Sequence, residues 1–106
     1  MKAETSFKKS ARKRLNELPR SWWLNVQMVA LRGVPDIIGC LGGRFVALEL
    51  KKDQSTLEAN RDGGILQGWV LRRIAAAGGY ARKVAPEQFD AVFEELKELA
   101  ALKRLD

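Results

Sequence analysis

Two adjacent glycines, Gly42-Gly43, constrain the fold of this 106-residue chain more than any other feature. They separate two runs of mainly apolar and β-favouring residues, at 34–41 and 44–52. A pair of glycines between such runs is typical of the two-residue turn of a β-hairpin. A turn at this place pairs residues whose numbers add up to 85. The sequence therefore predicts both a hairpin and its register.

This register brings two acidic side chains together. It places Asp36 opposite Glu49, and the alternation of side chains along a strand puts Lys51 on the same face as Glu49. Directly opposed residues have Cβ atoms roughly 4.5–5.5 Å apart, and like charges there destabilise a sheet unless a positive charge lies between them. A divalent cation would meet that need. We therefore expect a metal site at this end of the hairpin.

The composition limits the choice of metal. The chain has no histidine and a single cysteine, Cys40, so any metal must be held by oxygen ligands. Oxygen ligands favour Mg²⁺ or Mn²⁺ over zinc. Cys40 is expected on the site face of the hairpin, but without a histidine partner it is a poor nucleophile.

Two carboxylates and a lysine on one face suggest phosphodiester chemistry. The carboxylates would hold the cation, and the lysine would lie near the attacked phosphate or its water. Each part also has a plainer interpretation. Pro-Asp is common at turns, and Glu49 with Lys51 could form an ion pair on a solvated surface.

The charge distribution indicates a polyanionic partner. The chain carries a net charge of +6 with a pI near 9.8. Residues 1–20 have a local net charge of +5, whereas residues 86–106 have −3. Such asymmetry favours nucleic acid first and an anionic membrane surface second, although a solvated basic helix without a partner stays open. No apolar stretch is long enough to span a bilayer and no signal peptide is visible, so an intracellular protein is expected.

The length and the pattern of residues indicate a single α/β domain over 1–106, in the order α-β-β-β-α-β-α. Helical spacing places Glu4 one turn before Phe7 on the core-facing stripe of the first helix, whereas an N-cap at Thr5 or Ser6 would leave Glu4 outside it. The predicted elements are a helix over 5–18, a strand over 22–30, the hairpin at 34–41 and 44–52, a polar loop over 53–64, a helix over 65–77, a strand over 80–84 and a helix from Pro86.

A known family shows the same combination of motifs. The Gly-Val-Pro-Asp at 33–36, the Gly-Gly turn, the Phe-Val-Ala-Leu-Glu-Leu-Lys at 45–51 and Gln67 in the next helix resemble the PD-(D/E)XK nuclease superfamily. Within it the match is to the VRR-NUC (virus-type replication-repair nuclease) domain, in its small stand-alone phage form. The resemblance extends from Glu4 to about Val84.

The resemblance implies a restriction-endonuclease-like core, a mixed β-sheet flanked by helices, and assigns roles to residues. Asp36, Glu49 and the backbone carbonyl of Leu50 would bind Mg²⁺ or Mn²⁺, and Lys51 would be the catalytic lysine. Gln67 would lie beside that lysine and the scissile phosphate, although its amide could instead be satisfied by a backbone group. Glu4 matches an acidic residue of the family's first helix and is a further candidate ligand.

The function expected is that of a metal-dependent DNA nuclease, a phosphodiester hydrolase. The resemblance implies a homodimeric, structure-selective endonuclease that acts on branched DNA such as four-way (Holliday) junctions in replication, repair or recombination. If phage-encoded, it would work in the host cytoplasm. The basic residues expected to contact DNA are Lys8, Lys9, Arg12, Lys13, Arg32 and Arg61.

Two other functions remain open: a basic nucleic-acid-binding module without catalysis, and a structural or interaction domain with an acidic partner. Three tryptophans could stack on unpaired bases, but in so small a domain they are expected in the core or an interface: Trp22, Trp23 and Trp69. The dimer interface is expected at the Trp22-Trp23 pair or on the last helix.

Overall fold

The computed structural model describes residues 3–26, 33–53 and 64–102, and these form one α/β unit. Its elements follow the predicted order α-β-β-β-α-β-α. They are α1 (Ala3–Leu15), β1 (Ser21–Asn25), β2 (Ile37–Leu41), β3 (Arg44–Leu50), α3 (Gly64–Ala76), β4 (Tyr80–Val84) and α4 (Pro86–Ala101).

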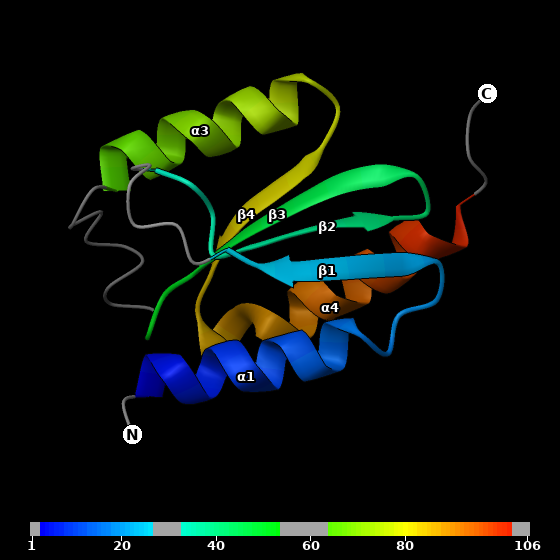
Figure 1. Cartoon of the computed structure of the whole chain (residues 1–106), viewed down its shortest axis with the longest axis horizontal. Helices are drawn as coiled ribbons and strands as arrows, with labels where there is room; N and C mark the ends of the chain where they lie inside the picture. The colour runs from blue at the N-terminus through cyan, green and yellow to red at the C-terminus, as the bar shows by residue number, and fades with distance from the viewer. Residues whose placement is uncertain (1–2, 27–32, 54–63, 103–106) are drawn as a thin grey trace.

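The four strands form one mixed sheet in the order β1-β2-β3-β4. Strand β2 is antiparallel to both β1 and β3, whereas β4 runs parallel to β3. A parallel neighbour requires a crossover connection, and α3 lies on that connection. Figure 1 shows α3 on one face of the sheet and both α1 and α4 on the other. The predicted mixed sheet flanked by helices is therefore confirmed, whereas its likeness to restriction endonucleases stays a prediction.

The β2–β3 hairpin has the predicted register. Gly42 and Gly43 have φ angles of 57° and 87°, and two central residues with positive φ are typical of the type I′ turn that joins twisted strands. Ile37 pairs with Leu48, and every further pair of the hairpin has numbers that add up to 85. The position of Asp36 relative to Glu49 therefore follows from the turn.

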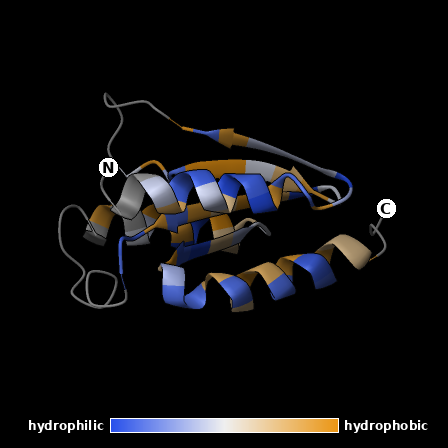
Figure 2. Cartoon of the chain, turned by 90° about the horizontal axis from the view of Figure 1, so that it is seen from below, coloured by the Kyte–Doolittle hydropathy of each residue, from blue (hydrophilic) through white to orange (hydrophobic). Residues whose placement is uncertain are grey.

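The hydrophobic core lies between the sheet and the α1/α4 layer. Val46, Leu48 and Leu50 project from β3 into it, and all three are buried. Helix α4 contributes an apolar stripe, and Figure 2 shows hydrophobic and hydrophilic residues alternating along it. The opposite face of β3 carries Glu49 and Lys51, so the candidate site lies on the α3 side of the sheet.

Several predicted boundaries need correction. Helix α1 begins at Ala3 rather than at about residue 5, so Glu4 lies within the helix and the alternative of an N-cap at Thr5 or Ser6 is excluded. Helix α1 ends at Leu15 rather than at residue 18, because the Asn16 amide and the following turn bond back to the last carbonyls of the helix. The strand expected over 22–30 ends at Asn25, and residues 27–32 lie outside the described part. Within the described ranges, every helix is too short or too polar to cross a bilayer.

Candidate active site

Asp36 is fixed at the start of β2 by two backbone groups. Its carbonyl accepts a hydrogen bond from the Val26 N–H at 2.8 Å, and its Oδ2 atom accepts one from the Leu50 N–H at 2.8 Å. The residue therefore links the ends of β1 and β3 across β2. The bond from the Leu50 N–H to Oδ2 is charge-assisted and holds the carboxylate in one orientation.

The Gly-Val-Pro-Asp segment packs closely against the first turn of α3. Gly33 has a φ of +81°, and a Cβ added there would lie 2.8 Å from the Leu66 Cγ atom. Only glycine meets both conditions without strain. Gly33 therefore lets the chain turn beneath α3 just before it delivers Asp36.

Glu49 is a buried carboxylic acid, with only 4% of its surface exposed. Burial and the negative charge of Asp36 together raise its pKa from 4.5 to about 7, and the positive charge of Lys51 acts in the opposite direction. The interaction between the two carboxylates agrees with the hairpin register continued by one residue. Near neutral pH, the protonated and ionised forms of Glu49 are therefore both populated.

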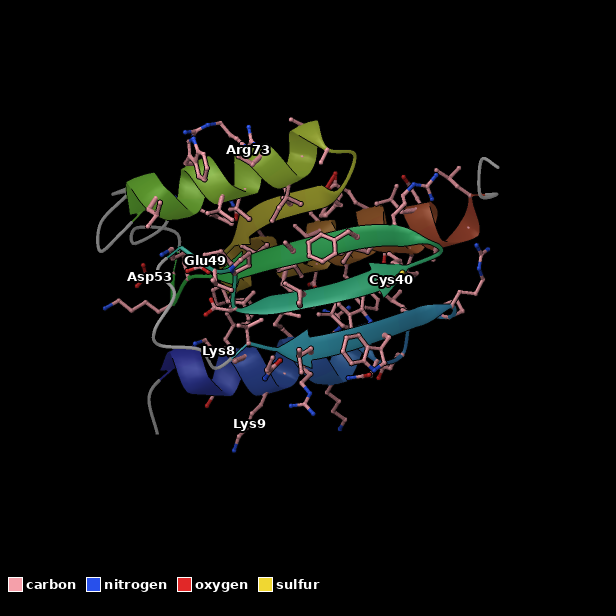
Figure 3. The ribbon with its side chains drawn as sticks, turned by 45° about the horizontal axis from the view of Figure 1, so that its top comes forward. Lys8, Lys9, Cys40, Glu49, Asp53 and Arg73 are labelled. Carbon is pink, nitrogen blue, oxygen red and sulfur yellow. The ribbon has the colours of Figure 1, made fainter. Side chains whose placement is uncertain are left out.

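Two lysines reach these carboxylates from different elements. Lys51 Nζ lies 3.6 Å from Glu49 Oε2, and the Lys51 side chain is only 11% exposed. Lys8 Nζ, from α1, lies 3.3 Å from Asp36 Oδ1. Figure 3 shows Glu49 and Lys8 near the same end of the sheet and Cys40 nearer the opposite end. Lys8, expected to contact DNA, is thus a member of the carboxylate cluster itself.

Four of the predicted site residues have side chains outside the described part of the structure. Gln67 lies in α3 and Glu4 in α1, but only their positions in the helices are described. Arg32 and Arg61 fall in the ranges 27–32 and 54–63, which are outside the described residues. Their expected roles stay predictions.

The remaining basic residues predicted to contact DNA line a hollow beside α1. It has a volume of about 220 Å³, and its walls are Lys9, Arg12, Lys13, Asn16 and Asn25. The Asn25 Oδ1 atom is buried there without a hydrogen-bond partner among the described residues. This part of α1 therefore presents three cations on the same side of the helix.

The three tryptophans have different environments. Trp23 is buried in the core, as expected, whereas Trp22 is 61% exposed and Trp69 is 53% exposed. Trp69 lies beneath the Arg73 guanidinium, 5.5 Å from it. Trp22 pairs with Cys40, which is exposed and does lie on the α3 face as predicted. The apolar stripe of α4 is used in the core, and of the two expected dimer interfaces Trp22 and, at the end of the last helix, Leu102 keep exposed apolar side chains.

The sequence interpretation missed two cations on the far side of Glu49. Lys83, on β4, pairs with Glu49 in the parallel register, so both side chains project from the α3 face. Burial and the charges of Lys51 and Arg72 lower the pKa of Lys83, while Glu49 acts to raise it. The second cation is Arg72, on α3, whose charge acts on Lys83.

The donor set of the site fits a hard divalent cation. It offers two carboxylates held side by side, one of them buried, and repulsion from Asp36 raises the pKa of Glu49. A cation between them would relieve that repulsion and favour the ionised form of Glu49. Within residues 3–26, 33–53 and 64–102, no three or more His, Cys, Asp and Glu side chains are grouped so that they could hold a metal ion. The candidate ligands among the described side chains are therefore Asp36 and Glu49.

Comparison of the chain with protein-family models, with curated proteins and with solved structures finds no match.

Proposed function

We propose that this chain is a metal-dependent nuclease that hydrolyses phosphodiester bonds in DNA, with Mg²⁺ or Mn²⁺ as cofactor. The observation that carries the proposal is the buried Glu49 carboxyl group, which lies near both Asp36 and Lys51. The resemblance of the 33–36 and 45–51 motifs to the PD-(D/E)XK superfamily supports the same function.

Asp36 and Glu49 would hold the cation, together with the Leu50 carbonyl and, from α1, Glu4. A bound Mg²⁺ or Mn²⁺ supplies a Lewis acid that polarises a phosphoryl oxygen and lowers the pKa of bound water. The chain's own contribution is to fix Asp36 through the Leu50 N–H, so that the two carboxylates keep one separation. Binding of the metal would release the Glu49 proton to solvent, because a carboxylate must be ionised to act as a ligand.

Lys51 would act on the water or on the phosphate. Its ammonium group is 3.6 Å from Glu49 Oε2 and largely shielded from solvent, so its charge acts through a medium of low dielectric constant. There it stabilises the negative charge that develops on the phosphate oxygens during in-line attack. The predicted place for Gln67 is beside it, on α3.

Cleavage assays on variants of the two central residues test this function. In Mg²⁺, Asp36→Asn and Lys51→Met should lower cleavage of labelled DNA at least about 100-fold, the scale on which loss of one electrostatic catalytic group acts. Their binding to the same DNA should persist. Asp90→Asn and Lys97→Met, exposed residues of α4, are the matched controls and should cleave like the wild type. Full cleavage by either site variant would contradict the proposal.

For the substrate we propose branched DNA handled by a homodimer. One small domain presents one site, and a two-fold dimer would present two sites to two strands. The exposed Trp22, at the edge strand of the sheet, supports a contact between copies. Cleavage of linear, flapped and four-way DNA should favour the four-way form, and light scattering should give the dimer mass. A monomer at micromolar concentration would contradict the dimer.

The hollow on α1 favours a second candidate, a nucleic-acid-binding module without catalysis. Lys9, Arg12 and Lys13 line it, and contacts with phosphate would be strongly salt-dependent. This candidate predicts binding but no Mg²⁺-dependent cleavage by the wild type. Titration calorimetry with Mn²⁺ also separates the two functions, because a binding module needs no metal at Asp36.

A further inference from the structure

Lys83 extends the site across β4. Glu49 and Lys83 are register partners on neighbouring parallel strands, so Lys83 lies beside Glu49 on the side away from Asp36. Neighbouring strands are about 4.8 Å apart, well within the length of a lysine side chain. Lys51 also acts electrostatically on Lys83, which places the two ammonium groups in one neighbourhood.

Helix α3 brings a second cation to the same place. A Cβ added at Gly68 would lie 3.3 Å from the Arg72 Nη1 atom and 4.0 Å from the Lys83 Nζ atom. Both cationic groups therefore gather over the one position of this helix turn that has no side chain. A glycine within a helix is less favourable than an alanine, yet here it leaves room between the helix and the two cations.

Several cations gather around the two carboxylates. Among the described residues, Lys8 lies beside Asp36, Lys51 beside Glu49, and Lys83 and Arg72 on the β4 side of Glu49. Burial lowers the pKa of Lys83, and repulsion from Lys51 and Arg72 acts in the same direction. A further anion on this side of Glu49 would remove that repulsion.

We propose that Lys83 and Arg72 form a second phosphate-binding position, on the β4 side of Glu49, which holds a backbone phosphate next to the one that is cleaved. This inference rests on the proposed nuclease function, because it takes the phosphate near Lys51 as the scissile one. The two positions define the path of the DNA strand, which crosses the sheet from Asp36 and Glu49 towards β4 and α3. Lys83 and Arg72 are positioning residues, since they contact a phosphate that does not react.

The test measures DNA binding without metal, so that it does not depend on cleavage. Binding of a fluorescent four-way DNA junction is titrated in EDTA at several salt concentrations. Lys83→Met should bind about tenfold more weakly, because a charge-assisted contact with phosphate is lost. The slope of log K against log salt should fall by about one unit, as expected for the loss of one phosphate contact. Lys83→Arg should restore both values.

Neighbouring residues of like charge provide the controls. Arg82 precedes Lys83 on β4 but forms an ion pair with Glu95 on the opposite face, so Arg82→Met should leave the binding constant and the slope unchanged. On α3, Arg72→Met should reproduce the loss and Arg73→Met should not, because Arg73 lies over Trp69. The Arg72 pair keeps the test valid should Lys83→Met fold poorly, since the Arg72 side chain is exposed.

Two results would overturn the inference. One is wild-type affinity and salt slope in both Lys83→Met and Arg72→Met. The other is a shift in urea midpoint with unchanged binding, which would make Lys83 a counterion of Glu49 and nothing more. Failure of the nuclease function is a separate outcome: the wild type would then bind DNA with the Lys83 contribution intact but show no Mg²⁺-dependent cleavage. Where cleavage is present, Lys83→Met should raise KM more than it lowers kcat.

Discussion

Glu49 should make the metal-free protein less stable as the pH rises. Burial, with the charge of Asp36, raises its pKa from 4.5 to about 7 on folding. The folded chain therefore holds the Glu49 proton more tightly than the unfolded chain does. This stabilisation is complete below pH 4.5 and is lost as the pH rises through 7. At about 1.4 kcal/mol per pH unit, the loss is roughly 3 kcal/mol in all and about 2.5 kcal/mol between pH 5 and pH 8.

Urea unfolding of Glu49→Gln, followed by tryptophan fluorescence in EDTA, isolates this contribution. Glutamine keeps the shape of the side chain but does not titrate, so the variant should gain about 2.5 kcal/mol relative to the wild type between pH 5 and pH 8. A constant offset from the new amide does not affect this difference. Glu94→Gln, which removes an exposed carboxylate of α4, is the matched control and should run parallel to the wild type.

Parallel pH curves for the wild type and Glu49→Gln would refute the reasoning, because Glu49 would then titrate alike in both states. Mn²⁺, added to the same two proteins in buffer without EDTA, gives a second comparison. Since metal binds the ionised carboxylate, the stabilisation by Mn²⁺ should be larger at pH 8 than at pH 6 in the wild type. In Glu49→Gln that stabilisation should be small at both values.

Two further perturbations follow from single contacts. Lys8→Met removes the ammonium group 3.3 Å from Asp36 Oδ1, so the affinity for Mn²⁺ measured by calorimetry should rise; an unchanged affinity would mean that Lys8 does not compete with the metal. Gly39→Ala would place a Cβ 2.4 Å from the Trp22 carbonyl oxygen and from the Trp23 ring. The free energy of unfolding measured in urea should therefore fall by roughly 1–3 kcal/mol. Wild-type stability would contradict the tight packing of β1 on β2.

The hairpin half of the site could be predicted because its determinants are local. Two glycines fix the turn, the turn fixes the register, and the period of the strand then gives the face of every following residue. The orientation of the Asp36 side chain depends on one further contact, the hydrogen bond from the Leu50 N–H, and the hairpin register brings these two residues close together. The type and order of the elements were predictable for a similar reason, since each has its own apolar period.

The β4 half could not be predicted in the same way. A parallel strand is joined through a crossover, and no turn rule sets its register against β3. The residue that pairs with Glu49 depends on how α3 packs on the sheet, through contacts such as that of Gly79 with the Ile74 side chain. Val84 is buried in the core, so alternation along residues 80–84 places Lys83 on the opposite face. The sequence therefore indicated the face of Lys83 but not its partner on β3. The contact of Lys8 with Asp36 could not be predicted either, because it depends on where α1 crosses the sheet.

The buried carboxyl group of Glu49 opposes the stability of the fold when it is ionised. It occupies a strand position between the buried residues Leu48 and Leu50, and α3 covers the face from which it projects. Ionising it there opposes folding, and Lys51 offsets only part of that opposition, as its raised pKa indicates. A neutral side chain at 49 would make the metal-free chain more stable at pH 8. Departures of this kind from local consistency concentrate at functional sites, so the cost of keeping a carboxylate at 49 is itself an argument that the residue binds something positive.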